Sequence, residues 1–499
     1  MAELEIIDAE IVSRHSTSTS SFHPLANKHN DDPSTIPSFF PIYTNAERQA
    51  ARQLLSPSDH EVVLGAGWAD SDPSSSDEDS PHRRPSSASS TSSLSHPSTP
   101  LLSPSTPSND AFLVRSCSQG WSLSFELHSS QPIPVPSHPD EVLIGNDAVG
   151  LNPVDWKSVS YNFGIPAFPW ILGRDIAGTV VQVPENNEKG WKVGDRVWTC
   201  ADSRQLSAGG YQRYSVHKQG TLAKVPEGME DEDAATLGTG LVTAAVALFA
   251  FFKLPPFNIQ DLTEKVQNLK ITEEEGKHWI VIYGGAAITG IYATQLSSLS
   301  NLNIIAVASP ANFFYLQSLG VTVCIDRHQP TSNILSSIST TLSTHGAQGK
   351  LRYAMDCVSS STANLCLQAL QSNSGGQQAE MICLAGNPKP EAIAQVNKGG
   401  EEKVKIHRIS FSTTFYHPNG TFTHAVLEYL TKLLERGELK PARPEVLADG
   451  LAGIRNGLEL LREGKAPRAK KLVVRVRDTP AADVTLCGVK SDLGWNGVV

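Results

Sequence analysis

A glycine-rich turn near the middle of the chain has the residue types that bind a diphosphate. Residues 278–290 read HWIVIYGGAAITG: a short apolar run, two consecutive glycines, small residues, and a third glycine where a helical pattern begins. A strand, a glycine turn and a helix in this order present free backbone N–H groups and the positive end of the helix dipole to an anion. The turn therefore predicts a nucleotide site, with an ordinary strand-to-helix turn as the alternative.

The residues after this turn favour the nucleotide site. A second apolar segment, NIIAVA (303–308), follows at the distance expected of a βαβ unit. It ends at Ser309, where a site specific for NAD usually carries an Asp or Glu that binds the ribose hydroxyls. A neutral side chain does not repel a 2′-phosphate. We therefore expect a nicotinamide cofactor, and NADPH rather than NADH.

The segments around the turn predict an α/β protein with two folded parts. From residue 278 to 411, six apolar runs alternate with helical segments, which is typical of a doubly wound parallel sheet, the Rossmann fold. Between residues 111 and 240, short alternating strands are separated by glycine turns, as in an irregular β-barrel. Residues 238–252 (GTGLVTAAVALFAFF) are apolar all round and predict a buried helix.

Composition limits the remaining classes of function. A segment made almost entirely of Ser, Pro, Thr, Asp, His and Arg (71–100) predicts that residues 1–110 are a disordered extension. The net charge of −10 gives no support for binding nucleic acid. The acidic N-terminus and the lack of any long apolar stretch argue against a signal peptide and a membrane span. Seven scattered cysteines fit reduced thiols, so we expect a cytoplasmic protein.

From about residue 111 to 477 the sequence resembles the medium-chain dehydrogenase/reductase superfamily, and within it the zinc-free quinone reductases and fungal trans-acting enoyl reductases. The matching segments are LNPVDWK (151–157), FPWILGRDIAGTVV (168–181), KVGDRVW (192–198), YGGAAITG (283–290) with Gln295, ASPAN (308–312), SLGVTVCID (318–326) and GLELLREGKAPRAKKLVVRV (457–476). The resemblance implies a GroES-like catalytic domain (111–240), a Rossmann NADP-binding domain (241–411), a return to the catalytic domain (412–477) and a tail (478–499).

The resemblance also bears on metal binding. In zinc alcohol dehydrogenases the turn after the barrel strand is Gly-His-Glu, and its His is a metal ligand. Here the turn is Gly173-Arg174-Asp175, no cysteine lies near Gly150, and there is no four-cysteine lobe. A charged guanidinium cannot ligate a cation. We therefore expect hydride chemistry without a metal.

Two residues are candidates for catalysis through the resemblance. The segment Val154-Asp155-Trp156-Lys157 is similar to the one that lines the cofactor and the active-site cleft, and Lys157 is its one cation. Thr243, at the start of the apolar helix, is similar to the threonine that faces the nicotinamide or the substrate carbonyl. The alternatives are a solvated surface lysine for Lys157 and a helix-start cap for Thr243.

The resemblance further implies a set of cofactor contacts. Those for the diphosphate are Gly285, Ala286, Ala287, Ile288, Thr289 and Gly290. Those for the adenosine 2′-phosphate are Ser309, Pro310, Ala311 and Asn312, and those near the nicotinamide are Leu384, Ala385, Ala466 and Pro467.

The sequence departs from its relatives at some of these positions. Relatives often carry serines in place of Ala286 and Ala287, so backbone N–H groups must bind the diphosphate here. A lysine common in relatives is replaced by Gln317, and a tyrosine by Arg327. Because a guanidinium pairs with phosphate in a bidentate way, we expect Arg327 to supply the missing cation.

Together these features predict an NADPH-dependent oxidoreductase of fungal secondary metabolism that adds hydride to an α,β-unsaturated carbonyl or thioester. The developing enolate would be stabilised by Lys157, Thr243 or backbone donors. The substrate would be a small enone or acyl-thioester, including one bound to a carrier protein of a polyketide synthase. An NADPH quinone oxidoreductase uses the same residues and stays open. So does a non-catalytic NADPH-binding scaffold whose working part is the Ser-rich extension.

Overall fold

The computed structural model describes residues 109–118, 120–255, 277–398, 402–417 and 420–480. Most of the predicted N-terminal extension (1–110) and C-terminal tail (478–499) lies outside these ranges. The two described residues of the extension, Asn109 and Asp110, begin a buried strand. The described fold therefore begins two residues before the predicted boundary.

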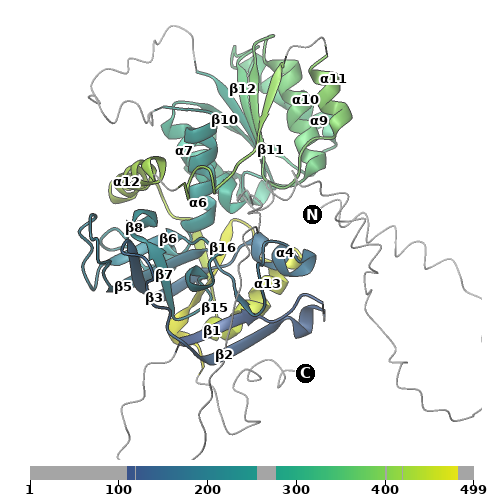
Figure 1. Ribbon diagram of the computed structural model, residues 1–499. Helices are drawn as coiled ribbons and strands as arrows, with labels where there is room; N and C mark the ends of the chain where they lie inside the picture. Colours follow the sequence, from purple (N-terminus) through teal and green to yellow (C-terminus); the bar gives the residue numbers. More distant parts are fainter. Residues whose placement is uncertain (1–108, 119, 256–276, 399–401, 418–419, 481–499) are drawn as a thin grey trace, which may run out of the picture.

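Two sheets form the barrel in the lower half of Figure 1. Their strands from the first part of the chain are β1 (Asn109–Val114), β2 (Phe125–Gln131), β3 (Glu141–Gly150), β4 (Trp170–Ile171), β5 (Asp175–Gln182), β6 (Arg196–Cys200), β7 (Tyr214–Lys218) and β8 (Leu222–Lys224). The three-stranded sheet has the order β2-β1-β4. The seven-stranded sheet has the order β15-β16-β3-β5-β6-β8, with β7 paired to β3.

The end of the chain completes this barrel. The strands β15 (Arg443–Leu447) and β16 (Lys470–Arg475) pair in parallel, and β16 pairs antiparallel with β3. The chain thus leaves the barrel, forms the second sheet and returns, as the sequence predicts. Because of this return, residues more than 300 positions apart meet inside the barrel.

The second sheet is parallel, with the order β11-β10-β9-β12-β13-β14. Its strands are β9 (Trp279–Tyr283), β10 (Asn303–Ala308), β11 (Val323–Asp326), β12 (Leu351–Asp356), β13 (Ala379–Cys383) and β14 (Val404–His407). All five residues of β9 are buried, as expected of a strand covered on both faces. Since β10 and β12 flank β9 on opposite sides, the strand order reverses there, and ligands bind at the carboxyl ends of such strands.

Helices cover both faces of this sheet (Figure 1). One face packs against α7 (Ile288–Leu299), and the other against α9 (Thr331–Thr344) and α10 (Ser360–Asn373). The side chains of β9 alternate between the two: Ile280 and Ile282 join the core on the α7 side, while Trp279 and Val281 join the core on the α9 and α10 side. Two shorter helices, α8 (Phe313–Ser318) and α11 (Pro390–Val396), complete the domain.

The other helices belong to the barrel and to the junction of the two parts. They are α4 (Pro153–Tyr161), α5 (Asp231–Ala234), α6 (Gly238–Ala245), α12 (Thr421–Glu435) and α13 (Ile454–Arg462). The apolar segment 238–252 forms α6 and continues as a π-helix over Val246–Phe251. The prediction of a buried helix is therefore confirmed, and the last part of that helix has the wider π-helical turns. Short 3₁₀ turns are η1 (Trp121–Leu123), η2 (Leu206–Ala208), η3 (Gln219–Thr221), η7 (Pro310–Asn312), η8 (Gly450–Gly453) and η9 (Val476–Asp478).

Hydrogen bonds from α7 hold the returning chain at the junction. The hydroxyl of Tyr292 accepts from the N–H of Ala442 at 2.9 Å and also bonds with the hydroxyl of Thr236 at 2.9 Å. The side chain of Gln295 donates to the carbonyl of Lys440 and accepts from its N–H. The helix that follows the glycine turn is therefore fixed to the segment that leads back to the barrel.

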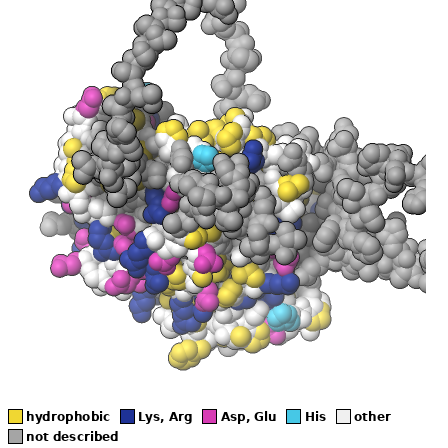
Figure 2. All heavy atoms as spheres, turned by 90° about the horizontal axis from the view of Figure 1, so that it is seen from below, with side chains coloured by type: hydrophobic (Ala, Val, Ile, Leu, Met, Phe, Trp, Pro, Cys, Tyr) yellow, Lys and Arg dark blue, Asp and Glu magenta, His cyan; other side chains and the backbone are white. Residues whose placement is uncertain are grey.

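The surface gives two further observations. On the face seen in Figure 2, Lys and Arg side chains are intermixed with Asp and Glu side chains. Among the helices that the structure describes, none combines the length and the apolar character needed to cross a bilayer.

Candidate active site

The glycine turn brings its backbone unusually close to its neighbours. Gly284 has a φ of +82°, which L side chains rarely adopt. A Cβ on Gly285 would lie 2.9 Å from the Cβ of Ala306, and one on Gly290 would lie 2.3 Å from the carbonyl oxygen of Gly284. Glycine is therefore required for the turn to fit between β10 and the start of α7.

This turn leaves backbone donors free at the start of α7. The N–H groups of Gly284 and Gly285 both donate to the carbonyl of Val307, at 3.0 and 3.2 Å, which holds the turn against β10. Within the described chain, the N–H groups of residues 288–290 make no hydrogen bond. They are the unsatisfied donors of a helix N-terminus, and they fit an anionic diphosphate.

The predicted 2′-phosphate residues lie together at the next two strand ends. Ser309 follows β10 and Arg327 follows β11, and these two strands are neighbours in the sheet. The Nε of Arg327 donates to the Oγ of Ser309 at 2.8 Å, and the N–H of Arg327 donates to the carbonyl of Ala308 at 3.0 Å. Pro310, Ala311 and Asn312 form the 3₁₀ turn beside them. The exposed guanidinium keeps further donors for a phosphate, so these residues fit NADPH.

Lys157 lies in α4, which begins with Pro153 after Asn152. Its side chain is half-buried, and its Nζ lies 5.9 Å from the centroid of the Trp156 ring. Across the described ranges, this Nζ has no hydrogen bond and no ion pair. Burial lowers the pKa of the Lys157 ammonium. These properties disfavour the alternative of a solvated surface lysine.

The structure shows a buried structural role for Asp155, which was predicted to contact the cofactor. Its carboxylate is 1% exposed, and its Oδ2 accepts from the hydroxyl of Tyr211 at 2.7 Å and from the N–H of Asn152 at 2.9 Å. Burial raises the pKa of this carboxyl. Asp155 therefore fixes the first turn of α4, and its contact with the cofactor stays a prediction. Its neighbours Val154 and Trp156 are also buried, each in an apolar core.

The structure also corrects the position of Thr243. The helix α6 begins at Gly238, so Thr243 lies within it and is 7% exposed; the alternative of a helix-start cap is wrong. A Cβ on Gly240 would lie 2.7 Å from the Cγ2 of Ile288, the first residue of α7. Residues three apart lie on one helix face, so Thr243 shares the face of α6 that contacts the diphosphate turn.

The remaining predicted contacts lie in two places. Leu384 and Ala385 follow β13, at the same edge of the sheet as the glycine turn, and the N–H of Leu384 donates to the carbonyl of Asp356 at 2.8 Å. Ala466 and Pro467 lie between α13 and β16, and α13 packs against α4.

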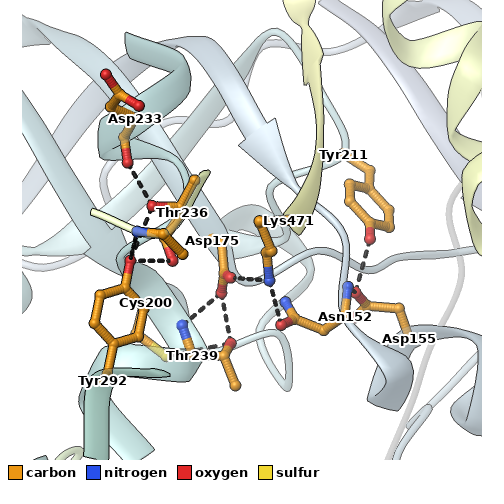
Figure 3. A network of polar contacts seen from close by, with 11 residues as sticks. Asn152, Asp155, Asp175, Cys200, Tyr211, Asp233, Thr236, Thr239, Tyr292 and Lys471 are labelled. Atoms are coloured by element: carbon orange, nitrogen blue, oxygen red, sulfur yellow. Dashed lines mark hydrogen bonds and ion pairs between the residues drawn. The ribbon is translucent and has the colours of Figure 1, made fainter. Parts of the chain in front are cut away.

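A buried polar cluster connects the elements of the site, and sequence reasoning missed it (Figure 3). The Nζ of Lys471 lies 2.5 Å from the Oδ2 of Asp175 and donates to the Oδ1 of Asn152 at 2.5 Å. The Oδ1 of Asp175 accepts from the N–H and the hydroxyl of Thr239, at 2.6 and 2.5 Å. One signal was available: in KKLVVRV, successive lysines of a strand must face opposite sides, so one of them points inward.

The side chains of the turn 173–175 also bind other groups of the protein. The Arg174 side chain is buried, and its Nε donates to the hydroxyl of Ser203 at 3.1 Å. In the part of the chain that the structure covers, no three His, Cys, Asp or Glu side chains form a group that could hold a metal ion.

Known proteins share this sequence and architecture. Residues 138–227 match the alcohol dehydrogenase GroES-like domain. A trans-enoyl reductase of Gibberella fujikuroi is 30% identical over 352 residues, which cover 68% of this chain and 91% of the relative. Another trans-enoyl reductase, from Petromyces alliaceus, is 29% identical over 356 residues, again 68% of this chain and 91% of the relative.

Solved structures with the same fold are more distant in sequence. The CurK enoyl reductase has a TM-score of 0.57 at 20% identity and covers 74% of this chain and 99% of its own. A mycobacterial protein solved in complex with NADPH has a TM-score of 0.55 at 19% identity, with the same coverage. Together with the sequence relatives, these two structures support a fold in which a GroES-like barrel is joined to a Rossmann domain.

Proposed function

The chain belongs to the medium-chain dehydrogenase/reductase superfamily, in the branch of the fungal trans-enoyl reductases, and on this basis we propose that it is a zinc-free, NADPH-dependent enoyl reductase. The proposed reaction adds hydride to the β-carbon of an α,β-unsaturated carbonyl or thioester and a proton to the α-carbon. The substrate is an enone or acyl-thioester, which includes a polyketide intermediate held on a carrier protein.

The residues at the sheet edge bind and orient the cofactor in this proposal. The free N–H groups of residues 288–290 bind the diphosphate, and Arg327 with Ser309 binds the 2′-phosphate. NADPH, when bound, supplies the hydride. Every other contribution comes from how the chain orients the substrate and stabilises the charge that develops on it.

Lys157 provides that stabilisation. As the β-carbon gains hydride, negative charge moves to the carbonyl oxygen, and a preorganised donor lowers the energy of that state most where water is excluded. The ammonium of Lys157 is half-buried and has no counter-ion in the described structure, so it is available as this donor. The hydroxyl of Thr243 donates a second, weaker hydrogen bond to the substrate carbonyl or the nicotinamide amide.

The observation that carries the proposal is this half-buried, unpaired lysine. The residues that bind the cofactor would also fit a non-catalytic NADPH-binding protein. In such a protein, however, a partly buried ammonium without a partner would cost free energy and serve no purpose. The lysine therefore favours the enzyme over the scaffold. A quinone reductase would place the same donor on a quinone oxygen, so substrate tests must separate the two reductases.

The test is NADPH oxidation by the purified chain with three substrates: a crotonyl thioester, a simple enone and a benzoquinone. We expect turnover with the thioester or the enone, and a saturated product by mass spectrometry. Turnover with the quinone alone would assign the chain to the quinone reductases. Tight NADPH binding without turnover of any of the three would contradict an enzymatic role.

A further inference from the structure

The buried ion pair between Asp175 and Lys471 lies where β3 and β6 end beside the start of α6, and it joins four elements of the fold (Figure 3). Asp175 begins β5 and Lys471 lies in β16. Their exposed side-chain fractions are 0% and 2%, so both charges are removed from water. Through Thr239 the pair binds the start of α6, and through Asn152 it binds the start of α4.

Two glycines make room for this cluster. A Cβ on Gly238 would lie 2.4 Å from the Oδ1 of Asp175. A Cβ on Gly150 would lie 2.8 Å from the Cε of Lys471. The backbones of α6 and β3 therefore approach the two charged side chains as closely as glycine allows.

Stability alone does not account for such a pair. Desolvation of two charges offsets much of their attraction, and apolar side chains of similar volume often stabilise a core as well or better. Hydrogen bonds to charged groups are directional, however, and they fix the groups that they join. Here they join the first turns of the two helices that carry the proposed catalytic residues: Lys157 in α4 and Thr243 in α6.

We propose that Asp175 and Lys471 are positioning residues, which fix the starts of α4 and α6 relative to each other so that Lys157 and Thr243 act on one substrate carbonyl. This inference rests on the proposed function. A shift of a catalytic group by about 1 Å can cost on the order of 10²-fold in rate.

The test uses a double variant, Asp175→Asn with Lys471→Met. Lys471→Met alone would leave a buried, unpaired carboxylate and is expected to destabilise the fold strongly. In the double variant no charge is stranded, and the amide oxygen that replaces the carboxylate can still accept from Thr239, but the bridge to Asn152 is lost. The matched control is Lys470→Met, since Lys470 is the neighbouring residue of β16 and its ion pair with Glu445 is exposed.

The measurements are the melting temperature, the NADPH dissociation constant and the single-turnover rate of hydride transfer at saturating NADPH, well below the melting transition. We expect the double variant to fold and bind NADPH like the wild type, with a rate lower on the order of 10²-fold. The control should match the wild type in all three. A lower melting temperature with an unchanged rate would make the pair purely structural and overturn the proposal.

A double-mutant cycle shows whether the pair acts through Lys157. In the Lys157→Met background the double variant should cost little further rate, because the group that it positions is gone. An equal loss in both backgrounds would overturn the proposal. If Lys157→Met itself leaves the rate unchanged, Lys157 is not the donor to the substrate carbonyl, and that part of the proposed function fails. A rate loss in the double variant would then have to act through another group.

Discussion

Two regions of the proposed site are built from different groups: the cofactor edge, formed by the glycine turn and Arg327, and the barrel side, formed by α4, α6 and the Asp175–Lys471 pair. At the cofactor edge, the N–H groups of residues 288–290 have no partner in the described structure and the side chain of Arg327 is exposed, and all lie within one stretch of the chain. On the barrel side, the contacts are buried side chains, and Lys471 and Asn152 are 319 positions apart in sequence. The first region is formed by residues that lie close together in the sequence. The second region forms only when the end of the chain returns to the barrel as β16.

This difference predicts that the two regions fail in different ways. Changes at the cofactor edge should alter the affinity for NADPH and leave the chemistry of the bound complex intact. Changes on the barrel side should alter the rate and leave affinity intact. Each variant below separates these two readouts, and a variant that moves both equally would weaken the distinction.

The largest effect is expected for Lys157→Met, which keeps most of the side-chain stem and removes the charge. Loss of one preorganised donor to a developing oxyanion typically costs on the order of 10²–10³-fold in rate. The single-turnover rate at saturating NADPH measures this, with Lys470→Met as the surface control. If instead the NADPH dissociation constant rises and the saturated rate recovers, Lys157 belongs to the cofactor edge.

The same variant should change the pH profile. Burial lowers the pKa of the Lys157 ammonium, and the protonated form is the donor. As the pH rises through this lowered pKa, the wild-type rate should fall at a pH below the ordinary range of lysine. Lys157→Met should lack this alkaline decrease. A decrease that persists in the variant would assign it to another group.

The next largest effect is expected for Arg327→Ala at the cofactor edge. A lost charge-assisted hydrogen bond corresponds to roughly 1.5–3 kcal/mol, or about one to two decades in affinity. NADPH binding should weaken by this amount and NADH binding should stay nearly unchanged, because only NADPH carries the 2′-phosphate. The neighbour His328, exposed and changed to Ala, is the control. Equal losses for both cofactors would show that Arg327 supports the fold.

A smaller effect is expected for Thr243→Val, which keeps the shape of the side chain and removes its hydroxyl. One neutral hydrogen bond corresponds to roughly a threefold to tenfold change in rate. Thr340→Val on α9 makes the same substitution on an exposed helical site far from the turn. An effect on NADPH affinity alone would place the Thr243 hydroxyl on the nicotinamide instead of the substrate.

The two regions also differ in how far the sequence predicted them. The six strands and the glycine turn follow from short-range patterns, and the family resemblance assigned Ser309 and Arg327 to one phosphate site. Their hydrogen bond is consistent with that assignment, because neighbouring parallel strands end at one edge. Strand alternation requires one inward lysine in KKLVVRV, but such a pattern identifies neither which lysine it is nor the inward role of Asp155. A charged residue faces inward only where a distant segment supplies its partner. Here Tyr211 is the partner of Asp155, and Asp175 and Asn152 are the partners of Lys471.

The smallest expected effect is no effect at all, from chelation of metal ions. Zinc alcohol dehydrogenases carry a metal-ligating His at the position of Arg174, whose Nε here donates to Ser203. The neighbouring carboxylate of Asp175 already binds the Lys471 ammonium and both donors of Thr239, so a second cation beside it would meet a positive charge and no free ligand. We expect full activity after dialysis against a chelator and no stoichiometric zinc by elemental analysis. One zinc per chain, with activity lost on its removal, would mean that the barrel side rearranges around a metal. Lys157 would then not be the only group that stabilises the charge on the substrate oxygen.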